Sequence, residues 1–304
     1  MNQKNPSNLA TSIHARLLNL KSEREDFNII LTRYAIERFL YRLSCSKSKS
    51  QFVLKGAMLF AVWTGRLQRP TRDVDLLGFG DSSIKHLHTL FRQICQTEVK
   101  PDGLEFDSES IEISEVREDQ EYEGVRIHLM AHLGKARIPV QIDIGFGDCI
   151  LPAPETIAYP TLLDFPAPHI RIYPRESVIA EKFEAMVSLG LENSRMKDFY
   201  DIDLFASEFD FNGKLLAQAI KATFERRQTS IPKRTPTPLT LRFSQNSLKK
   251  TQWKAFLNRS RLEDVSLPLS KVITSLRKFL IPPLKSIAEN RSFNLSWTKG
   301  DSWK

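Results

Sequence analysis

The sequence predicts an α+β protein in which an N-terminal lobe of helices and strands precedes a helical C-terminal lobe. Three observations predict this class. Apolar and polar residues alternate in three central segments, at 111–118, 124–133 and 137–147, and this alternation predicts strands. A proline-rich stretch follows at 151–174. Beyond it, apolar residues recur at helical spacing through most of the remaining chain.

The N-terminal lobe is expected to alternate helices with its first strands. Residues 25–43 carry apolar side chains at mostly helical spacing, which predicts an amphipathic helix with a core-facing stripe. The segment FVLKGAMLF then predicts a short strand and a helix from about Ala57. A loop leads to a strand that carries DVDLLGF, and Ser82 and Ser83 can cap the helix after it. The turn His132–Lys135 can join the last two predicted strands as an antiparallel pair.

The C-terminal lobe is expected to consist of helices after a boundary or an arm at the proline-rich stretch. We therefore expect domains of 1–150 and 151–304. Apolar periodicity predicts helices at 176–189, 195–208, 213–227, 246–258 and 269–289. The tail SFNLSWTKGDSWK places two tryptophans among polar residues, so it either packs on the body of the protein or contacts a partner.

Composition indicates an intracellular globular protein with an anionic partner. The 304 residues carry a formal net charge of +8, which favours nucleic acid as a partner over solubility alone. Three cysteines without CxxC spacing argue against a disulfide framework and suit a cytoplasmic protein. The N-terminus lacks the apolar core of a signal peptide, and no apolar run approaches the roughly 20 residues that span a bilayer. We therefore expect neither secretion nor membrane insertion.

Two aspartates on one predicted strand are the first candidate for chemistry. Alternate residues of a strand point to the same face, so Asp73 and Asp75 project together. Their apolar neighbours indicate partial burial, where two like charges repel unless a divalent cation lies between them. Paired carboxylates suit Mg²⁺ or Mn²⁺ bound with nucleotide phosphates. Asp143 lies mid-strand between two isoleucines and is the candidate for a third carboxylate.

Residues before this strand can bind the nucleotide. Gly56 follows Lys55 where a strand should turn into a helix, and a helix N-terminus can hold a triphosphate. The hydroxyl of Thr71, two residues before Asp73, can hydrogen-bond a phosphate oxygen. Taken singly, these residues also fit an ordinary glycine turn and a loop threonine.

A third cluster lies on two predicted helices, in ESVIAEKFEAM and SRMKDFYDIDLF. Lys182 is adjacent to a core phenylalanine and can reach a phosphate. Asp198 and Asp201 are three residues apart and share one helix face. Because apolar positions surround these charges, we expect them to be paired or functional rather than a solvated surface. Lys182, Asp198 and Asp201 are thus further candidates for catalysis and nucleotide binding.

Together these segments resemble the AbiEii/AbiGii-type toxin nucleotidyltransferases. LKGAMLFAVWTGRLQRPTRDVDLL is similar to their first signature, a KGG-like turn, a helix and R-x-S/T-x-D-I/V-D. ESVIAEK and RMKDFYD are similar to their later E-x-x-x-A-E-K and R-x-K-D-x-x-D elements, in the same order. The resemblance covers about 55–205. Ala57 stands where the family usually has a second glycine, and Thr71 replaces serine but keeps the hydroxyl.

The resemblance implies a polymerase β-like nucleotidyltransferase fold, with a mixed sheet in the N-terminal lobe. It implies that Asp73 and Asp75 bind metal, Thr71 helps to hold the nucleotide, Lys182 contacts the triphosphate and Asp198 is essential. It further implies NMP transfer from an NTP to an RNA 3′ end, with the tRNA acceptor end as the expected target, in a toxin–antitoxin or phage-defence system with a separate cognate antitoxin.

Basic residues late in the chain are candidate contacts for that RNA backbone. They are Lys233, Arg234, Arg242, Lys249, Lys250, Arg259 and Arg261.

Two other functions remain open. The same site can transfer a nucleotide to a protein hydroxyl, or the chain can be a catalytically silent nucleotide-binding or RNA-binding module. A zinc site is not expected, because the His-x-His pair at 86–88 and the histidines at 128 and 132 have no cysteine or carboxylate partners nearby.

Overall fold

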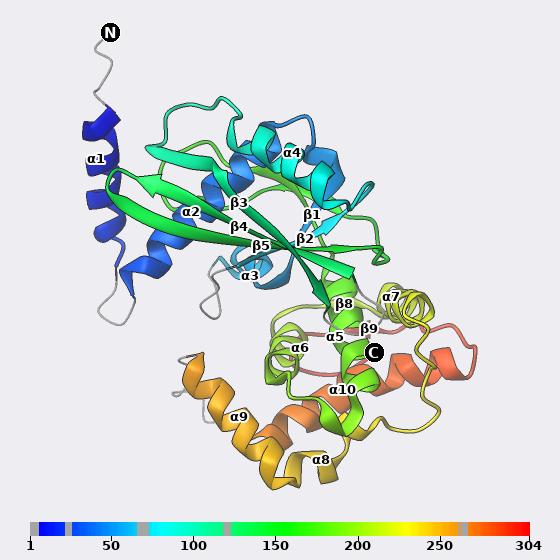
Figure 1. Ribbon diagram of the computed structural model, residues 1–304. Helices are drawn as coiled ribbons and strands as arrows, with labels where there is room; N and C mark the ends of the chain where they lie inside the picture. Colours follow the sequence, from blue (N-terminus) through cyan, green and yellow to red (C-terminus); the bar gives the residue numbers. More distant parts are fainter. Residues whose placement is uncertain (1–5, 22–25, 66–72, 118–122, 261, 263–266) are drawn as a thin grey trace. The chain divides into compact units, whose positions relative to one another are not determined.

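The computed structural model describes residues 6–21, 26–65, 73–117, 123–260, 262 and 267–304 (Figure 1). The chain divides into two compact units. The N-terminal unit comprises 1–147 and 155–173, and the C-terminal unit comprises 148–154 and 174–304. This division differs from the predicted boundary after residue 150, because part of the proline-rich stretch pairs with the N-terminal sheet.

A seven-stranded mixed sheet forms the centre of the N-terminal unit. Its order is β3-β4-β5-β2-β1-β7-β6, in which β2 lies parallel to β5 and antiparallel to β1. This sheet and the helices of both units confirm the predicted α+β class. The strands are β1 (Phe52–Lys55), β2 (Asp73–Gly78), β3 (Leu104–Arg117), β4 (Glu123–Leu133), β5 (Ala136–Phe146), β6 (Glu155–Ala158) and β7 (His169–Ile172).

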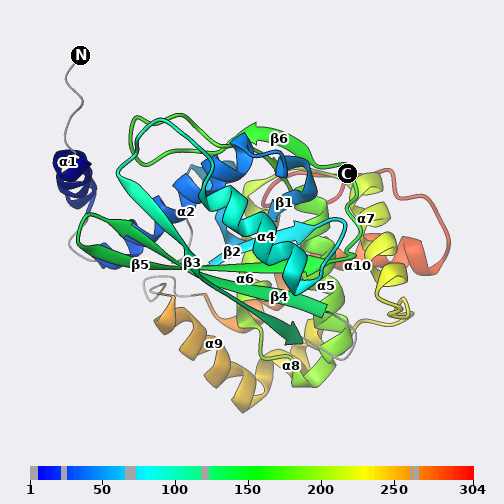
Figure 2. The same ribbon diagram turned by 45° about the horizontal axis from the view of Figure 1, so that its top comes forward.

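One face of this sheet is apolar and is covered by two helices, which Figure 2 shows from above. Phe39 of α2 contacts Phe106 of β3, and Phe91 of α4 contacts both Phe39 and Phe52 of β1. Strand alternation directs Val74 and Leu76 of β2 into this core, where both are fully buried. The opposite face carries buried Val53 and Leu77 and, beside them, the polar side chains of Lys55 and Asp75. The helical segments of this unit are α1 (Pro6–Leu18), α2 (Phe27–Cys45), η1 (Lys49–Gln51), η2 (Gly56–Met58), α3 (Leu59–Thr64) and α4 (Ile84–Cys95).

The three central strands lie where the sequence predicts them, as β3, β4 and β5. The prediction was incomplete at two places. The turn before Ala136 joins β4 and β5 in an antiparallel pair, as expected. Strand β3 begins at Leu104 rather than at 111, and its register shifts between Asp107 and Glu112. That irregularity breaks the alternation on which the prediction depended. Strands β6 and β7 were missed because they are short and lie among prolines.

The C-terminal unit is helical, as predicted. Phe183 packs on Phe224 between α5 and α7, and Phe199 stacks on Phe243 between α6 and α8. The elements are α5 (Arg175–Leu189), η3 (Gly190–Glu192), α6 (Met196–Glu208), β8 (Phe211–Asn212), α7 (Gly213–Arg226), η4 (Thr237–Leu239), α8 (Leu241–Gln245), α9 (Ser247–Arg259), α10 (Leu269–Ala288) and β9 (Ser296–Trp297). Within the described residues, no helix is both long and apolar enough to cross a membrane.

The C-terminal tail packs on its own unit. Strand β9 pairs with β8, and the Trp297 indole N–H donates to the Ala206 carbonyl at 2.7 Å. The Trp303 indole N–H donates to the Phe279 carbonyl at 2.9 Å. The Trp303 ring also stacks on that of Phe279. The Trp297 ring is buried, the Trp303 ring is half-buried, and both N–H groups donate to carbonyls, so the tail packs on the body of its unit.

A buried ion pair on α2 holds the segment that precedes β7. Glu37 and Arg38 are 2% and 1% exposed, and their charged groups lie 3.0 Å apart. The Glu37 carboxylate accepts the Leu162 N–H at 2.6 Å, and Arg38 donates to the Pro166 carbonyl. Burial outweighs these favourable contacts and raises the pKa of Glu37 from 4.5 to about 7.

This raised pKa predicts a stability difference that depends on pH. Since folded Glu37 holds its proton more tightly than the unfolded chain, its contribution is fully present below about pH 4.5 and is lost as pH rises through about 7. Glu37→Gln keeps an acceptor for Leu162 without the charge. We expect wild type to lose up to about 3 kcal/mol relative to E37Q between pH 4.5 and 8. Urea unfolding at both pH values measures this difference.

Glu105→Gln, at an exposed position on β3, is the control and should follow wild type at both pH values. A free energy difference between wild type and E37Q that stays constant across this range would contradict the raised pKa.

Candidate active site

The polar face of the N-terminal sheet brings the three predicted carboxylates together. Asp73 and Asp75 lie on β2, and Asp143 is directly opposite Asp75 on the parallel strand β5. One carboxylate oxygen from each of the three lies within 4.8 Å of the others. All three side chains are half-buried. The strand alternation that buries Val74 and Ile142 on the apolar face sends these carboxylates to the other face.

Gly56 provides the space for one of these carboxylates. Its φ of +76° lies in the left-handed region that favours glycine. A Cβ at this position would lie 1.8 Å from Oδ2 of Asp75. The adjacent Lys55 is opposite Asp75 in the β1–β2 register, and its ammonium lies 5.3 Å from the centre of the Tyr173 ring. The glycine thus has a steric role beside the acidic site, in addition to the turn that the sequence indicates.

Two residues that sequence reasoning missed hold Asp143. Arg126 of β4 donates to it through two nitrogens, Nε to Oδ1 and Nη2 to Oδ2, each at 2.8 Å. The side-chain amide of Gln141 donates to the same oxygens at 3.3 and 3.1 Å. The predicted β4–β5 turn contained the signal for Arg126. Counting equal steps back along both strands from the turn places Arg126 opposite Asp143.

The carboxylate oxygens of Asp73, Asp75 and Asp143 fit a hard divalent cation. Three convergent carboxylates on adjacent strands supply the oxygen ligands that Mg²⁺ and Mn²⁺ prefer. Gly56 leaves the Asp75 carboxylate the room to take part. Among the described residues, this is the one acidic group whose geometry suits a metal ion.

A second cluster lies within the C-terminal unit. The Lys182 ammonium on α5 lies 2.7 Å from Oδ1 of Asp198 and 2.9 Å from Oδ2 of Asp201, both on α6. Asp198 and Asp201 are 4% and 1% exposed. Sequence spacing correctly placed the two aspartates on one helix face. The structure adds that this face points at Lys182, so the lysine is held between two carboxylates.

The neighbouring Glu181 belongs to a separate buried ionic group. Arg227 is 2.8 Å from Glu184, 3.2 Å from Asp148 and 3.8 Å from Glu181. These three carboxylates raise the pKa of the Arg227 guanidinium against the opposing effect of burial. Successive residues of α5 therefore point to different partners, Glu181 toward Arg227 and Lys182 toward α6.

One of the candidate RNA contacts, Lys249, was predicted wrongly because it is buried. Lys249 is only 2% exposed, and its ammonium donates to the Asn193 carbonyl at 2.8 Å and to Gln252. Burial lowers the pKa of Lys249. It cannot contact an RNA backbone, because helix α9 turns it into the core. Thr71 and Arg261 lie outside the described residues.

Comparison with known proteins places this sheet, with its acidic group beside a glycine turn, in a nucleotidyltransferase. A model of the family described as "Nucleotidyl transferase AbiEii toxin, Type IV TA system" matches residues 38–278. The chain therefore belongs to the AbiEii family of nucleotidyltransferase toxins of type IV toxin–antitoxin systems. Membership also implies a cognate antitoxin as partner. A comparison with curated proteins finds no match.

Two solved structures from Helicobacter pylori share the fold. A protein assigned as a nucleotidyltransferase has a TM-score of 0.51 and 14% identity, covering 90% of this chain and 100% of its own. The protein JHP933 has a TM-score of 0.50 and 14% identity, covering 88% of this chain and 95% of its own. At this identity the likeness concerns the fold alone.

The contact between Gly56 and Asp75 predicts the effect of one added methyl group. In Gly56→Ala, the new Cβ would displace the Asp75 carboxylate. We expect the protein to fold with a loss of about 1–2 kcal/mol in stability, because alanine is strained in the left-handed region. If Asp75 takes part in the reaction, nucleotide transfer should fall by about a hundredfold or more, because a displacement of about 1 Å is enough to spoil the geometry of a reacting group. Thermal unfolding and transfer rates measure the two effects separately.

Gly134→Ala is the matched control. Gly134 also has a positive φ, +58°, but its Cβ would meet only Ala10 at 3.5 Å, an ordinary contact. It should show comparable strain with unchanged transfer. Equal activity in the two variants would contradict the steric role of Gly56.

Proposed function

We propose that this nucleotidyltransferase transfers an NMP from an NTP to an RNA 3′ end, that the tRNA acceptor end is its target, and that the product blocks translation. The carboxylate group of Asp73, Asp75 and Asp143 carries this proposal, with oxygens within 4.8 Å of one another. The surplus of basic residues supports a nucleic-acid acceptor. Membership of a type IV toxin–antitoxin family supports a role in phage defence alongside a cognate antitoxin.

The proposed reaction is an in-line displacement at the α-phosphorus. The RNA 3′-oxygen forms the new bond to the α-phosphorus and releases its proton to solvent, and the bond from that phosphorus to the α–β bridging oxygen breaks to release pyrophosphate. A Mg²⁺ or Mn²⁺ ion held by these carboxylates would lower the pKa of the attacking hydroxyl and neutralise the leaving group. The chain contributes Asp73, Asp75 and Asp143 as the ligand set. Lys55, Gly56 and Thr71 are proposed to hold the nucleotide.

We propose that Lys182, Asp198 and Asp201 are also required for transfer. Two buried carboxylates lie 2.7 and 2.9 Å from the Lys182 ammonium, and these two contacts fix its position. A cation held this firmly can stabilise triphosphate as a point charge without losing side-chain freedom on binding. The cluster also matches the later motifs of the family in residue type and order.

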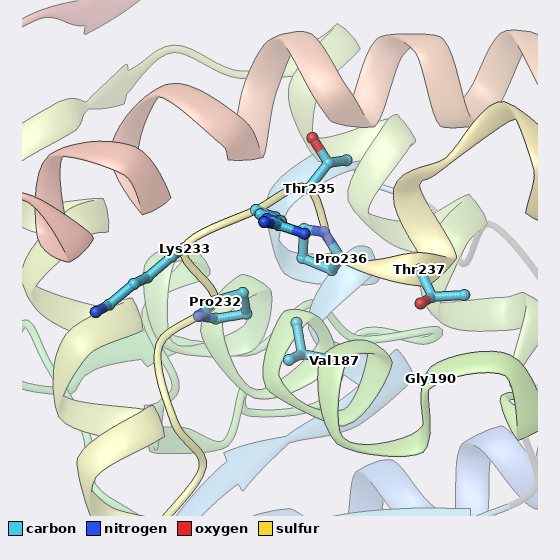
Figure 3. Close-up of a pocket in the computed structure, with 8 residues that line it drawn as sticks. Val187, Gly190, Pro232, Lys233, Thr235, Pro236 and Thr237 are labelled. Atoms are coloured by element: carbon cyan, nitrogen blue, oxygen red, sulfur yellow. The ribbon is translucent and has the colours of Figure 1, made fainter.

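The RNA backbone is proposed to contact the C-terminal unit on an acid-free segment, residues 226–262. This segment has ten Lys or Arg residues and no Asp or Glu. Lys250 and Lys254 are exposed and lie one turn apart on α9. Lys233 and Arg234 line an open pocket of about 470 Å³, which Figure 3 shows with Lys233 at one end and Thr237 and Gly190 at the other. Exposed Arg242 and Arg259 complete the candidates.

A labelling experiment tests the reaction. Purified protein is incubated with total tRNA, Mg²⁺ and each α-labelled NTP in turn. We expect label in tRNA with wild type and a loss of at least about a thousandfold with Asp73→Asn, because the amide cannot serve as an anionic ligand. Lys182→Met should also lose transfer. Circular dichroism and thermal unfolding establish that each variant is folded.

Asp164→Asn is the control, since Asp164 is a fully exposed aspartate of the same unit. Full transfer by D73N would contradict the proposed site. Label entering protein instead of tRNA would support nucleotidylation of a protein hydroxyl. NTP binding without any label transfer would support a silent binding module.

The acid-free segment predicts how RNA affinity depends on salt. Lys250→Glu/Lys254→Glu reverses two exposed charges on α9. We expect tRNA binding to weaken about tenfold near 0.1 M salt, and the slope of log K against log salt to become less steep by about 1.5. The control Lys214→Glu/Lys221→Glu reverses two exposed charges on α7. An equal effect of both double variants would assign the loss to net charge rather than to α9.

A further inference from the structure

Four charged residues form a single row across the polar face of the N-terminal sheet. In the observed registers, Lys55 of β1 is opposite Asp75 of β2, which is opposite Asp143 of β5, which is opposite Arg126 of β4. Directly opposite residues share a face and lie side by side. The row therefore reads positive, negative, negative, positive, and its two outer cations balance the two central carboxylates.

Arg126 contacts the carboxylate of Asp143 directly. Its guanidinium makes a two-point interaction with Asp143 at 2.8 and 2.8 Å, while Gln141 donates to the same two oxygens. The side chains of Arg126 and Asp143 are 35% and 24% exposed, so solvent screens the pair only in part. Both oxygens of Asp143 already accept hydrogen bonds from the protein. A metal ion that uses Asp143 must share it with Arg126 or displace that contact.

We propose that Arg126 is the resident counter-cation of the metal site, which orients Asp143 toward Asp75 and lowers the affinity of the site for divalent ions. This inference rests on the proposed function, because it assigns a role to Arg126 toward the same three carboxylates. In the protein alone, Arg126 offsets the repulsion between Asp75 and Asp143. The same positive charge opposes a cation that approaches them, so the site binds metal weakly until an anionic substrate adds its own charge.

This role of Arg126 predicts that its removal raises metal affinity, which a purely structural role does not predict. Arg126→Gln removes the positive charge and the two-point contact while keeping a polar side chain on β4. The protein without nucleotide should then bind Mn²⁺ about tenfold more tightly, because a unit charge a few ångströms away changes the affinity for a divalent ion by at least this factor. A residue that only held the sheet together would leave affinity unchanged or lower it.

Mn²⁺ binding to the full chain, followed by electron paramagnetic resonance of the free ion, tests this. Arg137→Gln is the matched control, because Arg137 is an exposed arginine on β5, six residues from Asp143. R137Q should bind Mn²⁺ like wild type. The gain from R126Q should shrink in an Asp143→Asn background, where the shared ligand is gone. Affinity in R126Q that equals or falls below that of wild type overturns the inference.

The outcome separates this inference from the proposed function. Wild-type binding that depends on Asp73, with no gain in R126Q, overturns the role of Arg126 alone. Absence of Mn²⁺ binding in wild type and R126Q overturns both the metal site and the role of Arg126.

A second measurement does not require R126Q to fold. In wild-type protein labelled with ¹⁵N-arginine, Mg²⁺ should shift the Nε–H resonance of Arg126, which the conservative variant Arg126→Lys identifies by its loss. The Nε–H resonance of Arg137 should stay in place. An Arg126 resonance that does not respond to saturating Mg²⁺ overturns the inference.

Discussion

The repulsion between neighbouring carboxylates on β2 and β5 is the constraint around which the N-terminal unit is arranged. Asp75 and Asp143 are opposite each other on parallel strands, and half-burial keeps water from screening them fully. An apolar core on the other face fixes both strands, so the carboxylates cannot move apart. Arg126 on the neighbouring strand β4 contacts Asp143 and so places a positive charge beside the two carboxylates.

This constraint explains features that otherwise look unrelated. Gly56 is needed because a side chain there would occupy the place of the Asp75 carboxylate. The parallel pairing of β2 with β5 brings Asp143 into the site, although 67 positions of sequence separate it from Asp75. The buried pair of Glu37 and Arg38 is stabilised differently. Its further partners are backbone groups of the segment before β7, the Leu162 N–H and the Pro166 carbonyl.

In the C-terminal unit, buried cations are surrounded by oxygen partners. Lys182 lies between two buried aspartates, and Arg227 among three carboxylates. Such groups are costly to break, because removal of one member leaves an unpaired buried charge. Lys249 shows the same principle with carbonyl and amide oxygens as its partners. Basic residues that remain exposed on the acid-free segment are accordingly the ones proposed to contact an RNA backbone.

The sequence alone determined the fold class, most helices and which three aspartates to consider as metal ligands, and the structure brings those three together. Strand alternation and helical periodicity are local signals, and they placed Asp73 and Asp75 on one face and Asp198 and Asp201 on another. Where a signal was interrupted, by the register shift in β3 or by the prolines around β6 and β7, the prediction was incomplete.

Only the tertiary structure decided which charges are neighbours. The contact of Arg126 with Asp143 depends on strand register, and the burial of Lys249 depends on which face of α9 meets the core. The assignment of residues 155–173 to the N-terminal unit depends on the pairing of β7 with β1. These are contacts between segments that are distant in the sequence, and the local sequence of one segment does not reveal its partner. Cross-strand pairing and packing are set by the whole core and not by local sequence.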